Sequence, residues 1–382
     1  MSNRIKQLDG LRFILAIIIV FSHIDYLGEI EFTKGIYDFL INSSYAVDCF
    51  FVLSGFGLYY KYHVTFSNKK IGIINSIKFA IKRISKIYPF YLLSLIVSMP
   101  LLLYNTYFFT NHILKSTFYI FIKCGVCTIL CQTLTGIKDF THAINAVCWF
   151  ISSLFICYIL CPFLIKKIDK IKNKKKLLSY SIIIFFIFIL ANYTSLLIDR
   201  KGISIFGYTI NMISYEHPFV RIWYLTIGML SAKTYILVYD NKKVPSTLEF
   251  FILFISLAFY LYGNIIENYI VYMLMKFLIF YMLITILALG EGKLCKILSS
   301  ELLTKLSSLS MYVYLFHYPI NQILGTIIFK NEIYFKSHMY LYAIFFVTEI
   351  FLDILIVFLI NKNKERIKNS KFLNLTIYIK NV

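Results

Sequence analysis

The feature that most constrains this chain is a series of long apolar runs that recur between residues 10 and 360. Each run holds about 18 to 22 residues, the length that an α-helix needs to cross a hydrocarbon core of about 30 Å. Lipid offers no water to backbone polar groups, so only helices or closed barrels can cross it, and these runs lack the alternation of barrel strands. Of the 382 residues, 59% are hydrophobic and only 15% are charged. The sequence therefore predicts an all-α integral membrane protein surrounded by a lipid bilayer.

The apolar runs predict a bundle of about ten transmembrane helices. The expected spans cover residues 10–28, 44–61, 88–106, 146–165, 177–198, 219–237, 248–263, 269–290, 306–328 and 340–361. Lysines and arginines gather in alternate connections, above all in 61–86 and 166–176, and the positive-inside rule assigns these connections to the cytoplasm. Both termini then also lie in the cytoplasm. We expect a membrane-embedded domain over 1–361 and a basic cytoplasmic tail over 362–382.

Two further segments are expected at the membrane surfaces. The stretch 72–86 alternates isoleucines with basic residues in an amphipathic pattern, so we expect a helix that lies along the inner surface. The segment 114–134 is apolar but contains Lys115, Lys123 and Gln132. If it crossed the membrane, the lysine-rich connection that follows would move outside, so we predict an interfacial or re-entrant helix on the outer face.

The net charge of +20 does not indicate nucleic acid as a partner, because the basic residues cluster in short loops. The eight cysteines, Cys124, Cys127 and Cys131 among them, have no partner histidine or second cysteine pair at zinc-ligand spacing, so we expect no metal site. No small-residue cleavage site follows the first apolar run, which is therefore expected to remain as the first span. The abundance of Lys, Ile, Asn, Phe and Tyr is typical of an AT-rich bacterial genome. We expect a multi-pass protein of the bacterial inner (cytoplasmic) membrane.

Ionisable residues within the apolar runs are costly in lipid, so each one raises a hypothesis about function. In QLDGLRFILAIIIVFSH, Arg12 and His23 are eleven positions apart. At about 100° per residue they return to within about 20° of the same helix face, with His23 about 16 Å further along the axis. They therefore line one stripe, with Arg12 near the cytoplasmic end and His23 in the outer half. We expect Asp9 to pair with Arg12 and to cap the helix.

Asp48, early in the second expected span, should reach a depth in the membrane similar to that of His23. A carboxylate beside an imidazole fixes its tautomer and raises its basicity, as a general base for a hydroxyl nucleophile requires. The alternative is a structural histidine with an unrelated aspartate. Further along the same span, Ser54, Gly55 and Gly57 are small enough to let another helix approach closely.

Later spans contain further polar residues. His317 is expected in the outer half of its span, where Pro319 should kink the helix. Glu349 and Asp353 are spaced i, i+4 and would repel each other if both were charged, so we expect one of them to pair with Lys276. Together these residues predict a polar cavity that contains histidine. Such a cavity is expected in either an enzyme or a transporter.

Several motifs follow one another in order along the chain. Arg12 and His23 have ten residues between them. The further motifs are VDCFFVLSGF at 47–56, KRISKIYP at 82–89, WFIS at 149–152 with Tyr158 and Pro162, Arg221 with Gly228, and YLFHYP at 314–319. This set resembles the motifs of the membrane acyltransferase-3 family, which include an arginine, ten residues, histidine signature. The resemblance extends over nearly the whole chain.

Two positions depart from the family pattern. The basic element commonly has two arginines, whereas Lys86 stands in place of the second, so a bidentate phosphate contact becomes a single point contact. Many members also have a glutamate shortly after the Trp-Phe pair, where this chain has Leu154. The resemblance is thus to a branch that works without this carboxylate, such as the exopolysaccharide acetylases or succinylases.

The resemblance implies transfer of an acyl group, usually acetyl, from acetyl-CoA or another cytoplasmic acyl-CoA to a hydroxyl of a carbohydrate or lipid-linked glycan. Arg12, Arg83 and Lys86 would bind the phosphates of the donor, although membrane topology alone also explains basic loop residues. His23, oriented by Asp48, would deprotonate the acceptor hydroxyl or carry the acyl group transiently.

Four further residues are candidates for the pocket: Ser54, Trp149, Arg221 and His317. We expect acyl-CoA as a substrate and no permanently bound cofactor. The alternative function is a glycan exporter or flippase without acyl chemistry. Such transporters usually show halves related by hydropathy symmetry, and no such symmetry is visible in this sequence.

Overall fold

The computed structural model describes residues 4–24, 43–109, 113–205, 207–238 and 244–330, with isolated positions between 344 and 363. The chain divides into two compact units. Unit 1 consists of Met1–Leu15, Ser44–Ala80 and Ser153–Ser308, and unit 2 consists of Ala16–Ser43, Ile81–Ser152 and Leu309–Val382. Both units draw on segments that are far apart in the sequence.

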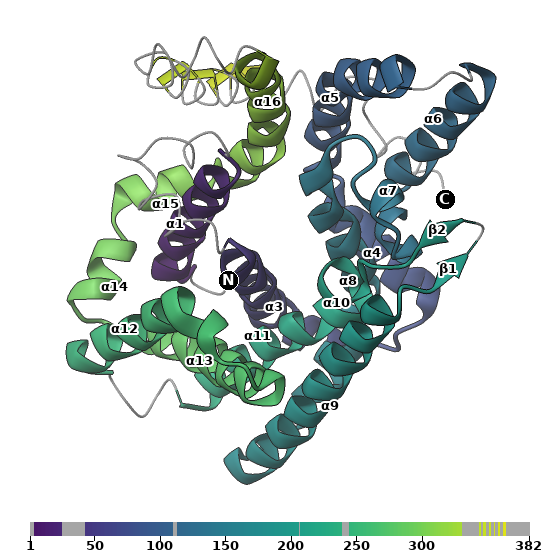
Figure 1. Cartoon of the computed structure of the whole chain (residues 1–382). Helices are drawn as coiled ribbons and strands as arrows, with labels where there is room; N and C mark the ends of the chain where they lie inside the picture. Colours follow the sequence, from purple (N-terminus) through teal and green to yellow (C-terminus); the bar gives the residue numbers. More distant parts are fainter. Residues whose placement is uncertain are drawn as a thin grey trace. The chain divides into compact units, whose positions relative to one another are not determined.

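The described part of the chain is almost entirely helical (Figure 1). The long helices are α1 (Lys6–Ser22), α3 (Ser44–Ser67), α4 (Ile73–Ile84), α5 (Tyr88–Phe109), α6 (Ile113–Thr128), α8 (Trp149–Asp169), α9 (Lys174–Lys201), α11 (Pro218–Val238), α12 (Ser246–Tyr262), α13 (Tyr269–Leu289) and α16 (Ser310–Lys330). Shorter helices are η2 (Gln132–Thr135), α7 (Lys138–Thr141), η3 (Ala146–Cys148), α10 (Ile213–Glu216), η5 (Gly263–Ile265), α14 (Lys293–Leu298) and α15 (Glu301–Ser307).

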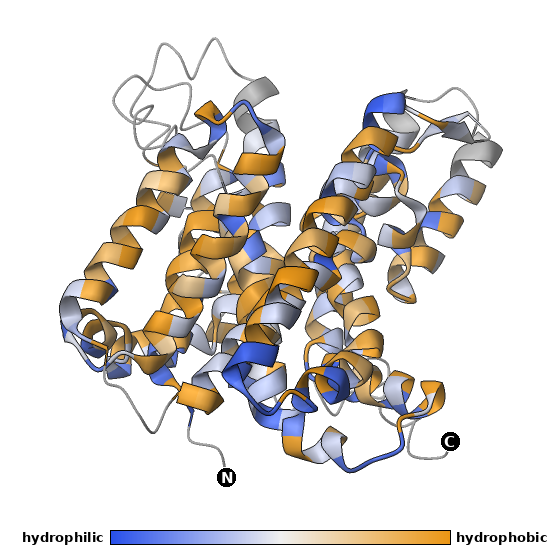
Figure 2. Ribbon diagram, turned by 90° about the horizontal axis from the view of Figure 1, so that it is seen from below, coloured by the Kyte–Doolittle hydropathy of each residue, from blue (hydrophilic) through white to orange (hydrophobic). Residues whose placement is uncertain are grey.

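The expected spans from 44–61 to 269–290 lie on described helices, and 306–328 combines the end of α15 with α16. The span 10–28 begins on α1 and its last residues lie outside the described ones, as does most of 340–361. Among the described residues, four helical stretches are long and apolar enough to cross a membrane, or up to five if the bent pair α4 and α5 is counted as one span. These four are Ala146–Asp169, Lys174–Lys201, Ser246–Ile265 and Tyr269–Leu289. Figure 2 shows much of the helical ribbon as hydrophobic, with hydrophilic segments concentrated near helix ends. The all-α class and the apolar helices are therefore as predicted, whereas the count of ten spans stays a prediction.

The two expected surface segments also form helices. α4 occupies 73–84, with Ile73 and Ile74 exposed and Ala80 buried, and its amphipathic character stays a prediction. α6 lies within 114–134 for most of its length and is too short, over Thr117–Thr128, to count among the spanning helices. Their positions at a membrane surface stay predictions.

Two glycines determine how closely α3 and α11 pack in unit 1. A Cβ atom at Gly55 of α3 would overlap the carbonyl oxygen of Leu225, and one at Gly228 of α11 would overlap the carbonyl oxygen of Val52. Small residues at a helix interface let two backbones approach in this way. The prediction for Gly55 is thus confirmed, whereas an added Cβ at Gly57 would meet none of the described residues within 4 Å, so Gly57 has no such role among them.

The ends of α1 and α12 in unit 1 are joined to the α13–α14 region by polar contacts. Gln7 donates from Nε2 to the carbonyl of Leu287 at 3.0 Å. The buried carboxylate of Glu249 accepts the backbone N–H of Gly292 at 2.6 Å and that of Cys295 at 3.2 Å, so it caps the start of α14. Burial and this nearby carboxylate raise the pKa of the Cys295 thiol to about 12.

Unit 2 packs α16 against α5 and the η3 segment. The rings of Phe90 and Tyr312 meet edge to face, with centroids 4.7 Å apart. Tyr91 donates from its hydroxyl to the carbonyl of Cys127 at 2.7 Å and accepts from Nε2 of Gln132 at 3.2 Å. These buried contacts hold α16 and its polar residues in place within unit 2.

A short hairpin follows α9. Gly202, at φ +57°, ends α9 in the left-handed conformation that glycine adopts without strain. The strands β1 (Ser204–Ile205) and β2 (Tyr208–Thr209) then pair antiparallel, with Ser204 opposite Thr209. Asp199 of α9 accepts the backbone N–H groups of Ile213 and Ser214 and so caps α10.

Candidate active site

The two histidines that the sequence analysis singled out meet in unit 2. His23 follows directly after the last residue of α1, and His317 lies in α16. Their ring centroids are 5.2 Å apart with an angle of 62° between the planes, and the ring of Tyr318 lies 5.9 Å from His23. His317 is completely buried, whereas His23 is half-buried. We call His23 and His317 the histidine pair.

Both members of the histidine pair are oriented by a contact between Nδ1 and the backbone carbonyl four residues earlier. Nδ1 of His23 lies 2.7 Å from the carbonyl oxygen of Ile19, and Nδ1 of His317 lies 3.2 Å from that of Val313. A carbonyl oxygen only accepts, so each Nδ1 must carry a hydrogen, and the lone pair of each neutral ring is then on Nε2. Within the described residues, Nε2 of His317 has no hydrogen-bond partner. Each ring therefore presents the unprotonated nitrogen that a general base requires.

Pro319 explains how α16 is held beside the short η3 segment. A proline within a helix lacks the N–H that would satisfy the carbonyl four residues earlier, which here belongs to Leu315. Nδ2 of the buried Asn145 donates to this carbonyl at 3.0 Å. The hydroxyl of Tyr314 donates to the carbonyl of Val147 at 2.8 Å. These two bonds fix the turn of α16 that carries His317.

Asn321 extends the polar face of α16 by one turn beyond His317. Its side chain is buried, and within the described residues its Nδ2 has no hydrogen-bond partner. The sequence analysis overlooked both Asn145 and Asn321. The spacing from Pro319 to Leu315 could have indicated that a donor such as Asn145 was needed, and the i, i+4 spacing from His317 could have indicated Asn321.

A second buried cluster, in unit 1, joins three helices through charge. Asp48 of α3 accepts from Nη1 of Arg221 in α11 and lies, through Oδ2, 2.5 Å from Nζ of Lys276 in α13. All three side chains are almost completely inaccessible, at 1%, 1% and 7%. We call these residues the charge triad.

Aromatic rings surround the cations of the charge triad. The guanidinium of Arg221 lies 4.1 Å from the ring centre of Tyr215 and 5.2 Å from that of Tyr224. Nζ of Lys276 lies 5.1 Å from the ring centre of Tyr272. Cation–π contacts of this kind stabilise desolvated cations. Because two cations share one carboxylate, the triad carries a net positive charge and ties α3, α11 and α13 together.

Lys276 has a partner that the sequence analysis did not propose. The expected partners, Glu349 and Asp353, lie outside the described residues, and the ammonium contacts Asp48. Asp48 belongs to unit 1 and His23 to unit 2, so their expected pairing stays a prediction. Within unit 1 both carboxylate oxygens of Asp48 face cations.

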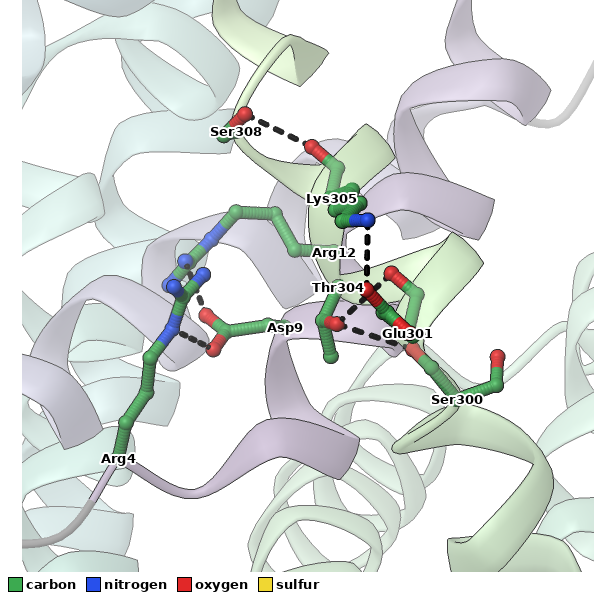
Figure 3. Close-up of polar contacts among 8 residues, drawn as sticks. All are labelled: Arg4, Asp9, Arg12, Ser300, Glu301, Thr304, Lys305 and Ser308. Carbon is green, nitrogen blue, oxygen red and sulfur yellow. Dashed lines mark hydrogen bonds and ion pairs between the residues drawn. The ribbon is translucent and has the colours of Figure 1, made fainter.

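Arg12 lies at a smaller cluster at the beginning of α1. Its Nη1 donates to Oδ1 of Asp9 at 3.1 Å, and Arg4 binds the other carboxylate oxygen (Figure 3). The predicted pairing of Asp9 with Arg12 is therefore confirmed. The predicted cap was wrong, because α1 begins at Lys6 and Asp9 lies within its first turn, where a carboxylate favours the positive end of the helix dipole. The exposed pair Lys305 and Glu301 lies in α15, also drawn in Figure 3.

The remaining candidates lie on several elements. Arg83 is half-buried near the end of α4, and Lys86 is exposed in the turn that follows. Ser54 is half-buried in α3, and Trp149 is buried at the start of α8. Leu154, at the position of the family glutamate, is buried in α8 with 2% exposure. The structure thus brings together His23 with His317 and Asp48 with Arg221.

Comparison with known proteins agrees with the motifs. A family model for the acyltransferase domain of the acyltransferase-3 type matches residues 5–360, which is nearly the whole chain. A search of curated proteins and a search of solved structures found no match. The apolar helices and this match together indicate a membrane protein with acyltransferase activity. The chain belongs to the acyltransferase-3 family.

Proposed function

We propose that this protein transfers an acyl group, most simply acetyl, from cytoplasmic acyl-CoA to a hydroxyl of a surface or exported polysaccharide or glycolipid. The family supports acyl transfer to a hydroxyl-bearing acceptor. The observation that carries the chemistry is the orientation of His23, whose Nδ1 contact with Ile19 leaves the ring lone pair on Nε2. The proposal includes about ten spans, cytoplasmic termini and a bacterial inner membrane as the setting.

In the proposed reaction, Nε2 of His23 accepts the proton of the acceptor hydroxyl while that oxygen attacks the thioester carbonyl carbon. The new ester bond forms, the carbon–sulfur bond breaks, and the thiolate of coenzyme A leaves with the proton from His23. Transfer through a transient acyl-His23 is the other route, in which the imidazole attacks first and the hydroxyl attacks second. Ring contact with His317 keeps the His23 ring in place on either route.

The donor is proposed to bind through its phosphates at the cytoplasmic end of the helices. Arg12, Arg83 and Lys86 supply positive charge there. The Arg12 side chain is 33% exposed beside Asp9. Ser54, Trp149, Arg221 and His317 remain candidates for the rest of the pocket, and Asp48 for the orientation of His23.

The test is mass spectrometry of surface glycans from a deletion strain complemented with the wild type or with His23→Ala. We expect the deletion to remove one acyl mass from the glycan, the wild type to restore it, and His23→Ala to fail while still inserting in the membrane. Full acylation with His23→Ala would contradict the mechanism. Glycans that stay inside the cell with their acyl content unchanged would instead indicate an exporter.

A further inference from the structure

A small hollow in unit 1 lies at the beginning of α4. Its volume is about 300 Å³, at the lower end of the range for ligand sites. It is lined by Phe66, Lys69, Lys70, Ile71, Asn75, Ser76 and Pro162. These residues come from the end of α3, the connection to α4, the first turn of α4 and the middle of α8. None of them carries a negative charge, and two are lysines.

The first turn of α4 supplies backbone donors to this hollow. The N–H of Ser76 bonds to the carbonyl of Gly72 at 3.1 Å, so Gly72 is the residue at which the helical bonding begins. The N–H groups of Ile73, Ile74 and Asn75 precede the first bonded N–H of the helix and lack helical acceptors of their own. α4 continues for 12 residues, long enough for its dipole to favour an anion at this end.

Ser76 is an independent indication of a ligand. Ser76 lines the hollow although it is only 1% exposed, and within the described residues its Oγ has no hydrogen-bond partner. A buried hydroxyl is normally satisfied, because leaving it without a partner in an apolar surrounding is unfavourable. An oxygen-rich group in the hollow would provide that partner.

The lysines complete an anion site. Lys69 and Lys70 are exposed at the hollow. Nζ of Lys166, from α8, donates to the backbone carbonyl of Lys69 at 2.7 Å, which ties this connection to α8 and adds a third positive charge. Phe66 forms an apolar wall that is held by an edge-to-face contact with Phe79, with centroids 5.1 Å apart.

We propose that this hollow binds a phosphate group of the nucleotide end of the acyl-CoA donor, with Lys69, Lys70, the Ser76 hydroxyl and the α4 N-terminus as its contacts. Phosphate matches this set of donors because it is a compact anion with several acceptor oxygens. The inference rests on the proposed function for the identity of the donor. The same chemistry would also suit a lipid headgroup or free phosphate, and the test separates these sources.

The experiment uses the full chain in neutral-lipid nanodiscs and measures binding of adenosine 3′,5′-bisphosphate by calorimetry. We expect Lys69→Gln with Lys70→Gln to weaken binding about tenfold or more, and Ser76→Ala to weaken it by about threefold. Lys78→Gln, which removes an exposed charge from the same helix outside the hollow, is the control and should leave the affinity unchanged. Equal affinities for the double variant and the control would overturn the proposal.

Two further arms identify the source of the phosphate. Inorganic phosphate should bind much more weakly than the bisphosphate, and equal affinity would overturn the nucleotide assignment. Replacing the neutral lipid with phosphatidylglycerol should leave bisphosphate binding intact, and loss of binding that depends on Lys69 and Lys70 would indicate a lipid headgroup and overturn the assignment.

Failure of this site and failure of the proposed function give different results. If the site is correct, the double variant raises KM for acyl-CoA and leaves kcat near that of the wild type. Acyl transfer with an unchanged KM would reject the site alone. Bisphosphate binding that depends on the lysines, in a protein that transfers no acyl group, would reject the proposed function alone.

Discussion

The charge triad of unit 1 and the histidine pair of unit 2 are both buried polar clusters, yet their groups are used in opposite ways. In the triad, the carboxylate of Asp48 faces two cations, and aromatic rings cover those cations. In the histidine pair, each ring uses Nδ1 for a local carbonyl and keeps Nε2 as its lone-pair nitrogen. The triad is therefore suited to holding helices together, and the histidine pair is suited to moving a proton.

The largest effect on stability should come from breaking the charge triad. Asp48→Ala leaves the cations of Arg221 and Lys276 buried without their carboxylate, so we expect a loss of about 3–5 kcal/mol in the free energy of unfolding. Lys276→Met should also lower stability, but by less, because Asp48 keeps Arg221 as a partner. Thermal or denaturant unfolding in detergent provides the measurement.

Glu301→Gln is the matched control for the triad. It breaks an exposed ion pair with Lys305, in which the two side chains are 74% and 80% accessible. Exposed pairs contribute little, so its unfolding midpoint should equal that of the wild type. A wild-type midpoint for Asp48→Ala as well would contradict the view that the triad holds α3, α11 and α13 together.

The next largest loss of stability is expected at the close-packed interface between α3 and α11. Gly55→Ala would place a methyl group against the backbone carbonyl of Leu225, so we expect a loss of about 1–3 kcal/mol from overpacking. Gly57→Ala adds the same methyl group to the same helix where no described residue lies within 4 Å, and it should be neutral or slightly stabilising. Equal unfolding midpoints for the two variants would contradict the interface.

A smaller loss of stability is expected in unit 2, where a hydrogen bond from Asn145 holds the turn of α16 that carries His317. Asn145→Ala removes the donor to the carbonyl of Leu315 and should cost about 1–3 kcal/mol, because that carbonyl then lacks a partner. Pro319→Ala restores a backbone N–H that can bond to the same carbonyl, so Asn145→Ala should cost less in its presence. A double-mutant cycle measures this coupling, which should be about 1 kcal/mol, and additive losses would show that the two residues act separately.

Much of this molecule was predictable from its apolar runs and motif spacing. The all-α class and the helices over 44–61 and 177–198 follow from long apolar segments, and the pairing of Asp9 with Arg12 follows from i, i+3 spacing. The role of Gly55 followed from its size, but Gly57 shows that size alone does not tell which face of a helix meets a neighbour.

The contacts that define the two clusters were not predictable from spacing. Asp48, Arg221 and Lys276 are far apart in the sequence, and a local pattern does not show which helices become neighbours. The contact of His23 with His317 joins the end of α1 to α16 for the same reason. The cap assigned to Asp9 failed because helix ends are the least certain part of a sequence-based assignment, and α1 begins three residues earlier than Asp9.

The central claim is that Nε2 of His23 acts on the acceptor hydroxyl. The most direct measurement is the rate of acyl transfer by purified His23→Ala, His317→Ala and wild-type protein, each with its unfolding midpoint recorded. We expect His23→Ala to lose about 10²–10⁴-fold in rate while its midpoint stays at the wild-type value, and His317→Ala to lose less. Wild-type transfer by a folded His23→Ala protein would contradict the account.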